Sequence, residues 1–289
     1  MPDTVASPRT LAELLAAAAG QLERGGAVGN GRREAAGLWA ALAGISAGDV
    51  WLHRNEPPAA ESIERFHHAV ERRATGAPFA YAVERIAFRT LDLRSDPRAL
   101  IPRPETEGLV ELALQVAAGG AAADIGTGSG CIALSLAVEG AFDHIVAVER
   151  SPAAAALARE NVARTRPRTP IDIREGELLE PLGTERFRVI VANPPYLTAA
   201  EYDALDPAVR NFEPREALVS GEDGLDATRA LLAGAAAHLE RDGLLALEID
   251  ERRAGAVHAL AQSAGWGNVV TRDDLFGRTR YALVFAEGA

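Results

Sequence analysis

The chain has 289 residues, 48% of them hydrophobic, which is enough to bury a large core and to form two domains. Its net charge of −11, with acidic residues spread along the chain, argues against a protein that grips a nucleic-acid backbone, because such proteins carry basic patches. One cysteine excludes an intramolecular disulfide, the first ten residues show no targeting signal, and no apolar run approaches ~20 residues, so we expect a cytoplasmic protein without membrane spans.

Residues 1–75 are predicted to form a helical domain. Apolar residues recur at helical spacing between Leu11 and Leu22, a pattern typical of an amphipathic helix. Further helices are expected over about 32–42 and about 60–73. Glycine and proline residues end the first and the last of these segments.

Residues 76–99 contain short alternating stretches and are predicted to be a linker with a β-hairpin. Over residues 100–289, strand-like and helix-like segments alternate. This alternation predicts an α/β domain whose sheet is mostly parallel and carries helices on both faces. Residues 243–249 are predicted to be a central strand and residues 280–285 another.

A glycine-rich segment, residues 124–130, follows a short apolar stretch and opens onto a helix-like run. Glycines allow a tight turn and let backbone approach a ligand closely. The spacing G-x-G-x-G differs from the G-x-G-x-x-G of dinucleotide-binding proteins, and a chain without lysine cannot form a P-loop. About twenty residues further on, a second strand ends at Glu149, where a carboxylate would accept both hydroxyls of a ribose. An acidic site without lysine suits a positively charged nucleoside such as S-adenosylmethionine.

The tetrad Asn193-Pro194-Pro195-Tyr196 directly follows a buried, strand-like run. Neither proline can continue a sheet, and the residue before a proline is held extended, so Asn193 would stand at the strand's carboxyl end. The Asn193 side-chain oxygen and the Pro194 carbonyl offer two acceptors beside an aromatic ring, which suits a planar NH2 group. Alternatively, these residues form only a rigid strand-to-loop turn.

On these motifs the chain resembles the class I methyltransferases of the HemK/PrmC family, which methylate the side-chain amide of a glutamine in peptide-chain release factors. The resemblance covers nearly the whole chain. Besides the tetrad it rests on Ala80-Tyr81 and on residues 101–107, 212–214, 247–249 and 277–280. The tetrad also occurs in adenine and guanine amino methyltransferases, so it specifies the chemistry better than the substrate.

The resemblance implies a Rossmann-like, mostly parallel seven-stranded sheet in a methyltransferase domain, with a small helical N-terminal domain that recognises the substrate. It also implies S-adenosylmethionine as cofactor and S-adenosylhomocysteine as product. The cofactor-binding residues would be Asp124, Gly126, Thr127, Gly128, Ser129, Gly130, Glu149, Leu178 and Asn193. Catalysis and substrate binding would use Asn193, Pro194, Pro195 and Tyr196, with Arg103 also contacting the substrate.

Two positions depart from the family pattern: relatives usually have Asp at Glu149 and commonly Gly at Asp250. No metal is expected, because a sulfonium is already an activated leaving group and the six histidines show no ligand-like spacing.

The favoured substrate is the glutamine of the Gly-Gly-Gln motif in class I release factors, with no direct nucleic-acid binding. Two other hypotheses keep the chemistry but change the substrate, to a glutamine of a ribosomal protein or to an amino group of a nucleic acid. A further hypothesis is a cofactor-binding partner module without activity. The sequence does not decide the oligomeric state.

Overall fold

The computed structural model describes residues 10–26, 29–117 and 119–286, so the expectation about the first ten residues falls almost wholly outside them. The chain divides into two compact units. The first runs up to Arg85 and also contains Asp206–Phe212, and the second comprises Ile86–Leu205 and the chain from Glu213 onward. The boundary lies within the segment for which the sequence predicts a linker.

The first unit is helical. Its helices are α1 (Leu11–Arg24), α2 (Gly31–Ala43), α3 (Ala47–Leu52), α4 (Ala60–Ala74), α5 (Phe79–Val83) and α10 (Pro207–Arg210). The three long helices predicted from periodicity are present, whereas α3 and α5 are too short to show a period. A side-chain oxygen caps α1, α2 and α3, because Thr10, Asn30 and Ser46 accept from backbone N–H groups of the first turn.

The core of the first unit packs around an edge-to-face pair, Trp39 and Phe66, whose ring centroids lie 5.4 Å apart. Leu11, Leu14 and Leu22 of α1, which the periodicity placed on one face, are buried in the same cluster as this pair, together with Leu38 of α2 and Val70. The first unit therefore has a hydrophobic core of its own.

A two-stranded sheet of β1 (Arg85–Phe88) and β2 (Leu91–Arg94) lies in the segment for which the sequence predicts a hairpin. The second unit contains a seven-stranded sheet in the order β5-β4-β3-β6-β7-β9-β8. Its strands are β3 (Ala121–Ile125), β4 (His144–Glu149), β5 (Ile171–Glu175), β6 (Phe187–Ala192), β7 (Leu239–Glu248), β8 (Asn268–Asp273) and β9 (Thr279–Phe285). Only β9 runs antiparallel to its neighbours, which confirms the predicted mostly parallel sheet.

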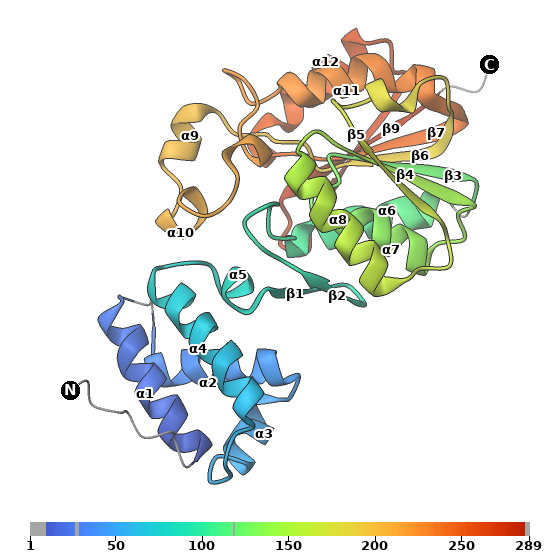
Figure 1. The fold of residues 1–289 in the computed structure, drawn as a ribbon. Coiled ribbons are helices and arrows are strands. Elements are labelled where there is room, and N and C mark those ends of the chain that lie inside the picture. Colours follow the sequence, from blue (N-terminus) through green and yellow to red (C-terminus); the bar gives the residue numbers. More distant parts are fainter. Residues whose placement is uncertain (1–9, 27–28, 118, 287–289) are drawn as a thin grey trace. The chain divides into compact units, whose positions relative to one another are not determined.

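Helices cover both faces of this sheet (Figure 1). One face carries α6 (Pro104–Val116), α7 (Cys131–Glu139) and α8 (Pro152–Thr165), and the other carries α11 (Asp226–Gly234) and α12 (Ala254–Ser263). The strands alternate between two cores, since Val189 and Val191 join the first and Ile190 and Ala192 the second. Such strands are buried on both sides, which explains their continuous apolar sequence.

Strand order reverses at β3, which lies between β4 and β6. Ligands of open parallel sheets bind beyond the carboxyl ends of the strands at such a reversal. The fold therefore places the ends of β3, β4 and β6, where the glycine-rich segment, Glu149 and the tetrad begin, around one crevice.

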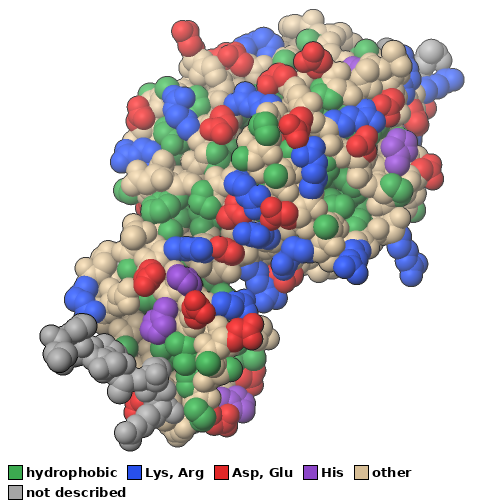
Figure 2. Space-filling model, in the orientation of Figure 1, with side chains coloured by type: hydrophobic (Ala, Val, Ile, Leu, Met, Phe, Trp, Pro, Cys, Tyr) green, Lys and Arg blue, Asp and Glu red, His purple; other side chains and the backbone are tan. Residues whose placement is uncertain are grey.

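None of the described helices has the length and apolar character needed to cross a membrane. On the face drawn in Figure 2, arginines lie interspersed with aspartates and glutamates. Many charged side chains of the described residues form ion pairs, such as Arg98 with Glu160 at 2.7 Å.

Candidate active site

A cavity of about 370 Å³ opens at the carboxyl ends of β3, β4 and β6 in the second unit. The predicted site residues that line it are Arg103, Gly126, Thr127, Gly128, Ser129, Glu149, Leu178, Asn193 and Pro195. The other predicted residues do not line it: Asp124 and Gly130 are buried, and Pro194 and Tyr196 belong to the turn that follows Asn193.

The glycine loop, residues 126–130, joins β3 to α7 and forms one wall of the cavity. Gly126, Gly128 and Gly130 have φ angles of 74°, 56° and 84°, a region that side chains rarely adopt. The Gly126 and Thr127 amides donate to the Val148 carbonyl at 2.9 and 3.0 Å, which holds the loop against β4. A Cβ added to Gly126 would meet no atom within 4 Å, so this glycine presents bare backbone to open space.

Asp124, near the end of β3, holds this loop through two hydrogen bonds. Its Oδ2 accepts from the Thr127 hydroxyl at 2.5 Å and from the Ala133 amide at 3.0 Å, which ties the loop to the first turn of α7. Burial raises the pKa of Asp124 to about 7, and the Thr127 hydrogen bond opposes this shift. Asp124 is fully buried, and its Oδ1 has no partner among the described residues. The contacts of Asp124 make it a support of the loop.

Glu149, at the end of β4, presents a carboxylate to the cavity. Its Oε2 accepts from the Gly128 amide at 2.9 Å and its Oε1 from the Ser151 amide at 2.8 Å. Each oxygen has a second lone pair, so the carboxylate can still accept from two hydroxyls. The side chain of Glu is one methylene longer than that of Asp. The two backbone amides nevertheless fix where the Glu149 carboxylate lies.

Leu178 supplies an apolar part of the lining beyond β5. Its φ of 47° is left-handed, which is uncommon for a residue with a branched side chain. Nearby Gly176 is constrained as well, since a Cβ there would meet Pro181 Cγ at 2.4 Å. A glycine-rich loop, a fixed carboxylate and an apolar wall together fit a nucleoside that carries positive charge.

The tetrad begins where β6 ends, with Ala192 paired to both neighbouring strands. Asn193 Nδ2 donates to the Thr106 hydroxyl at 3.1 Å, and this hydroxyl donates to Glu248 Oε2 at 2.7 Å. Thr106 lies in the first turn of α6 and Glu248 at the end of β7, and both are buried. Burial raises the pKa of Glu248 to about 7, while its hydrogen bond with Thr106 and the charge of Arg280 lower it.

Thr106 and Glu248 were missed as individual site residues, although each lies in a segment that carries the family resemblance. The available signals were a threonine in the first turn of a helix that begins with proline, and an acidic residue ending a central apolar strand. Nothing local in the sequence indicates that the two side chains meet.

Arg103, immediately before α6, lines the cavity and is held by Glu213. Its Nη2 donates to Glu213 Oε1 at 2.6 Å, and the Ile101 amide donates to Oε2 at 3.1 Å. Glu213 is buried, so Arg103 compensates its charge while its remaining N–H groups stay available.

Tyr196 is half-buried, and burial raises its pKa to about 12, so its phenol is neutral at physiological pH. A later segment of the chain packs closely against the backbone of this residue. A Cβ on Gly224, whose φ is 78°, would meet the Tyr196 carbonyl oxygen at 2.5 Å, which explains the glycine there.

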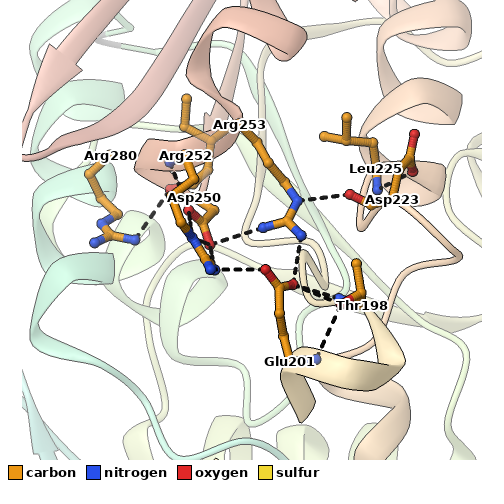
Figure 3. A network of polar contacts seen from close by, with 9 residues as sticks. Thr198, Glu201, Asp223, Leu225, Asp250, Arg252, Arg253 and Arg280 are labelled. Atoms are coloured by element: carbon orange, nitrogen blue, oxygen red, sulfur yellow. Dashed lines mark hydrogen bonds and ion pairs between the residues drawn. The ribbon is translucent and has the colours of Figure 1, made fainter. Parts of the chain in front are cut away.

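Asp250 organises the polar network drawn in Figure 3. It accepts from Arg252 Nη2 at 2.5 Å and from Arg253 Nη1 at 3.1 Å. Arg253 also donates to Glu201 at 2.6 Å and to the Asp223 carbonyl at 2.8 Å. Glu201 lies in α9 (Ala199–Asp203), which begins shortly after the tetrad, so the network braces the chain that leaves the tetrad.

In the described part of the chain, no three His, Cys, Asp or Glu side chains gather as a metal site would require.

Two family models match this chain: the methyltransferase small domain over residues 106–211 and the PrmC N-terminal domain over residues 7–83. A release factor glutamine methyltransferase of Xylella fastidiosa strain Temecula1 is 44% identical over 239 residues, which are 81% of this chain and 86% of the relative. One of Geobacter sulfurreducens is 39% identical over 254 residues, 88% of this chain and 89% of the relative.

Among solved structures, a methyltransferase from Pyrococcus furiosus superposes with a TM-score of 0.53 at 22% identity, covering 70% of this chain and 92% of that chain. This similarity shows a shared fold. The family models and the sequence relatives go further and confirm the resemblance drawn from the motifs. The chain belongs to the family of release factor glutamine methyltransferases.

Proposed function

We propose that this protein transfers a methyl group from S-adenosylmethionine to the side-chain amide nitrogen of the glutamine in the Gly-Gly-Gln motif of class I release factors. The observation that carries the proposal is the position of Asn193, whose amide stands at a strand end in the cavity wall and uses its nitrogen on Thr106. Its oxygen is thereby left as an acceptor.

Methylation of an amide is difficult because the nitrogen lone pair is delocalised into the carbonyl, a resonance reflected in the ~18–20 kcal/mol barrier to amide rotation. Asn193 Oδ1 and the Pro194 carbonyl accept the two N–H groups of the substrate amide and aim its lone pair at the methyl carbon. Each hydrogen bond contributes about 1–3 kcal/mol, whereas near-ideal orientation contributes roughly 7–11 kcal/mol. Asn193 therefore acts as a positioning acceptor and takes no proton.

When bound, S-adenosylmethionine supplies an electrophilic methyl group on a sulfonium. Glu149 accepts the ribose hydroxyls, the glycine loop contacts the methionine and ribose, and Leu178 packs against the adenine. Tyr196 packs against the substrate amide, and Arg103 contacts the peptide that carries it. The cavity lining supports the roles given to Glu149, the glycine loop, Leu178 and Arg103, and the place of Tyr196 in the tetrad supports its role.

The first unit, matched by the PrmC N-terminal domain, contributes to recognition of the intact protein substrate. All the groups that hold the cofactor and the reacting amide belong to the second unit. Since release factors act during translation termination, the activity belongs in the cytoplasm.

The test is to incubate the protein with methyl-labelled S-adenosylmethionine and, separately, a class I release factor, total ribosomal proteins and DNA. We expect label on the release factor, mapped by mass spectrometry to the glutamine of Gly-Gly-Gln. A substrate variant with glutamate at that position is the matched control and should take up none. Label on a ribosomal protein or on DNA instead would overturn the proposal in favour of that substrate.

A further inference from the structure

Three side chains from separate elements form a chain of hydrogen bonds that begins in the cavity wall, which Asn193 and Thr106 line. Asn193 follows β6, Thr106 lies in α6 and Glu248 ends β7. The Asn193 nitrogen donates to Thr106 at 3.1 Å, and Thr106 donates to Glu248 at 2.7 Å. Within the residues described, no group donates to the Asn193 oxygen.

The direction of this chain follows from the capacity of each group. An ionised carboxylate only accepts, and a threonine hydroxyl has a single proton to donate. Once that proton is used on Glu248, Thr106 can only accept from Asn193. The amide of Asn193 must then turn its NH2 group toward Thr106 and its oxygen the other way. Because the two ends of an amide are almost the same size, packing alone would distinguish them poorly.

We propose that Thr106 and Glu248 are positioning residues that fix the Asn193 amide so that its oxygen, rather than its nitrogen, faces the substrate amide. The inference rests on the proposed function, because only an acceptor facing the cavity can hold the N–H groups of a glutamine. Neither residue touches the reacting atoms. Thr106 sets the orientation directly, and Glu248 sets it both through Thr106 and through its own side-chain hydrogen bond with Asn193.

The ionisation state of Glu248 determines the direction in which the hydrogen bonds of this relay run. A protonated Glu248 could donate to Thr106, which would then donate to the Asn193 oxygen and turn the NH2 group toward a substrate that also presents N–H donors. Burial raises the pKa of Glu248 to about 7. The titratable and charged groups that act on Glu248 come from α6, α7, β9 and the tetrad: Glu105, Cys131, Arg280, Tyr281 and Tyr196. Among them, Arg280 favours the ionised form and Glu105 disfavours it.

The test compares Thr106→Val, which keeps the shape but removes the hydroxyl, with Thr106→Ser, which keeps the hydroxyl. Thr228→Val, at an equally buried threonine in α11, controls for the general cost of such a change. For each full-length variant we would measure kcat on the release factor, calorimetric affinity for S-adenosylmethionine, and solvent exchange of the Asn193 side-chain NH2 protons by NMR.

Thr106→Val should lower kcat roughly tenfold or more while cofactor affinity stays within twofold, because a mis-set acceptor affects only the transition state. One Asn193 NH2 proton should exchange slowly in the wild type and in Thr106→Ser, and rapidly in Thr106→Val. Thr106→Ser should recover most of the rate, and Thr228→Val should match the wild type.

Equal rates and equal Asn193 proton exchange in Thr106→Val and the wild type would overturn the inference. A wild-type protein inactive on the release factor would instead overturn the proposed function. The proton exchange of Asn193 would then still decide whether Thr106 fixes its amide, because that measurement needs no substrate.

Discussion

On the proposed cofactor side of the cavity, Glu149 and the glycine loop are fixed by backbone N–H groups, whereas on the proposed acceptor side Asn193 is fixed by side chains from two other elements. The cofactor side joins groups that are at most 21 residues apart in sequence, since Glu149 accepts from Gly128 and Ser151. The acceptor side joins Thr106, Asn193 and Glu248, which are far apart along the chain. Backbone donors tolerate many substitutions around them, but a side-chain relay depends on every member. The acceptor side should therefore be the more sensitive to mutation.

Removal of the acceptor itself should have the largest effect. Asn193→Ala deletes the oxygen that we propose holds a substrate N–H, together with the orientation that it enforces. The loss should cost more than about 3 kcal/mol, or over a hundredfold in kcat. Single-turnover kinetics with saturating cofactor would measure it. Asn193→Asp keeps an acceptor and should retain more activity than Ala. Wild-type rates in both variants would mean that the tetrad is only a structural turn.

The buried carboxylate of the relay should make the stability of the protein depend on pH. The folded-state pKa of Glu248 is raised from 4.5 to about 7, so between these values the folded protein holds a proton that the unfolded chain releases. Wild-type stability is thus lost as pH rises through this window. Because Gln does not titrate, the free energy of unfolding of Glu248→Gln relative to wild type should increase by about 3 kcal/mol from pH 4.5 to above 7.

Urea denaturation of both proteins at several pH values would measure this difference. A difference that does not change with pH would show that Glu248 is ionised in the folded protein throughout the range.

On the cofactor side, Glu149→Ala should weaken S-adenosylmethionine binding roughly tenfold, since charge-assisted hydrogen bonds of this kind contribute about 1.5–3 kcal/mol. Glu149→Asp keeps the carboxylate on a shorter side chain and serves as the control. Calorimetry on the two variants measures the effect. An affinity for Ala within twofold of the wild type would remove Glu149 from the cofactor site.

The smallest effect is expected from a substitution in the first unit, which contains neither side of the cavity. Trp51 in α3 is 63% exposed with the Arg54 guanidinium 4.1 Å from its ring centre, and exposed tryptophans often anchor interfaces. Trp51→Ala should raise KM for the intact release factor about fivefold, corresponding to about 1 kcal/mol. Methylation of a short Gly-Gly-Gln peptide should not change. An equal effect on protein and peptide would contradict a recognition role.

The contrast also explains how far the sequence could lead. Strand ends, glycines with positive φ and a proline-bounded asparagine leave local signals, so the sheet, the glycine loop, Glu149 and Asn193 were predicted. The Thr106–Glu248 pair depends on which strands become neighbours, and no local pattern encodes that. No role could be assigned to Asp250 for the same reason. Its partner Arg253 also bonds to Glu201 and to the Asp223 carbonyl, and only the fold brings these groups together.

Cys131, at the start of α7, gives the protein a native reporter of whether the cavity is filled. It lines the cavity and is the only thiol of the chain, yet burial raises its pKa to about 12. Because the thiolate is the reactive form, an alkylating reagent should modify this thiol slowly at neutral pH. A ligand that fills the cavity should slow the reaction further, so ligands can be ranked by how strongly they protect Cys131.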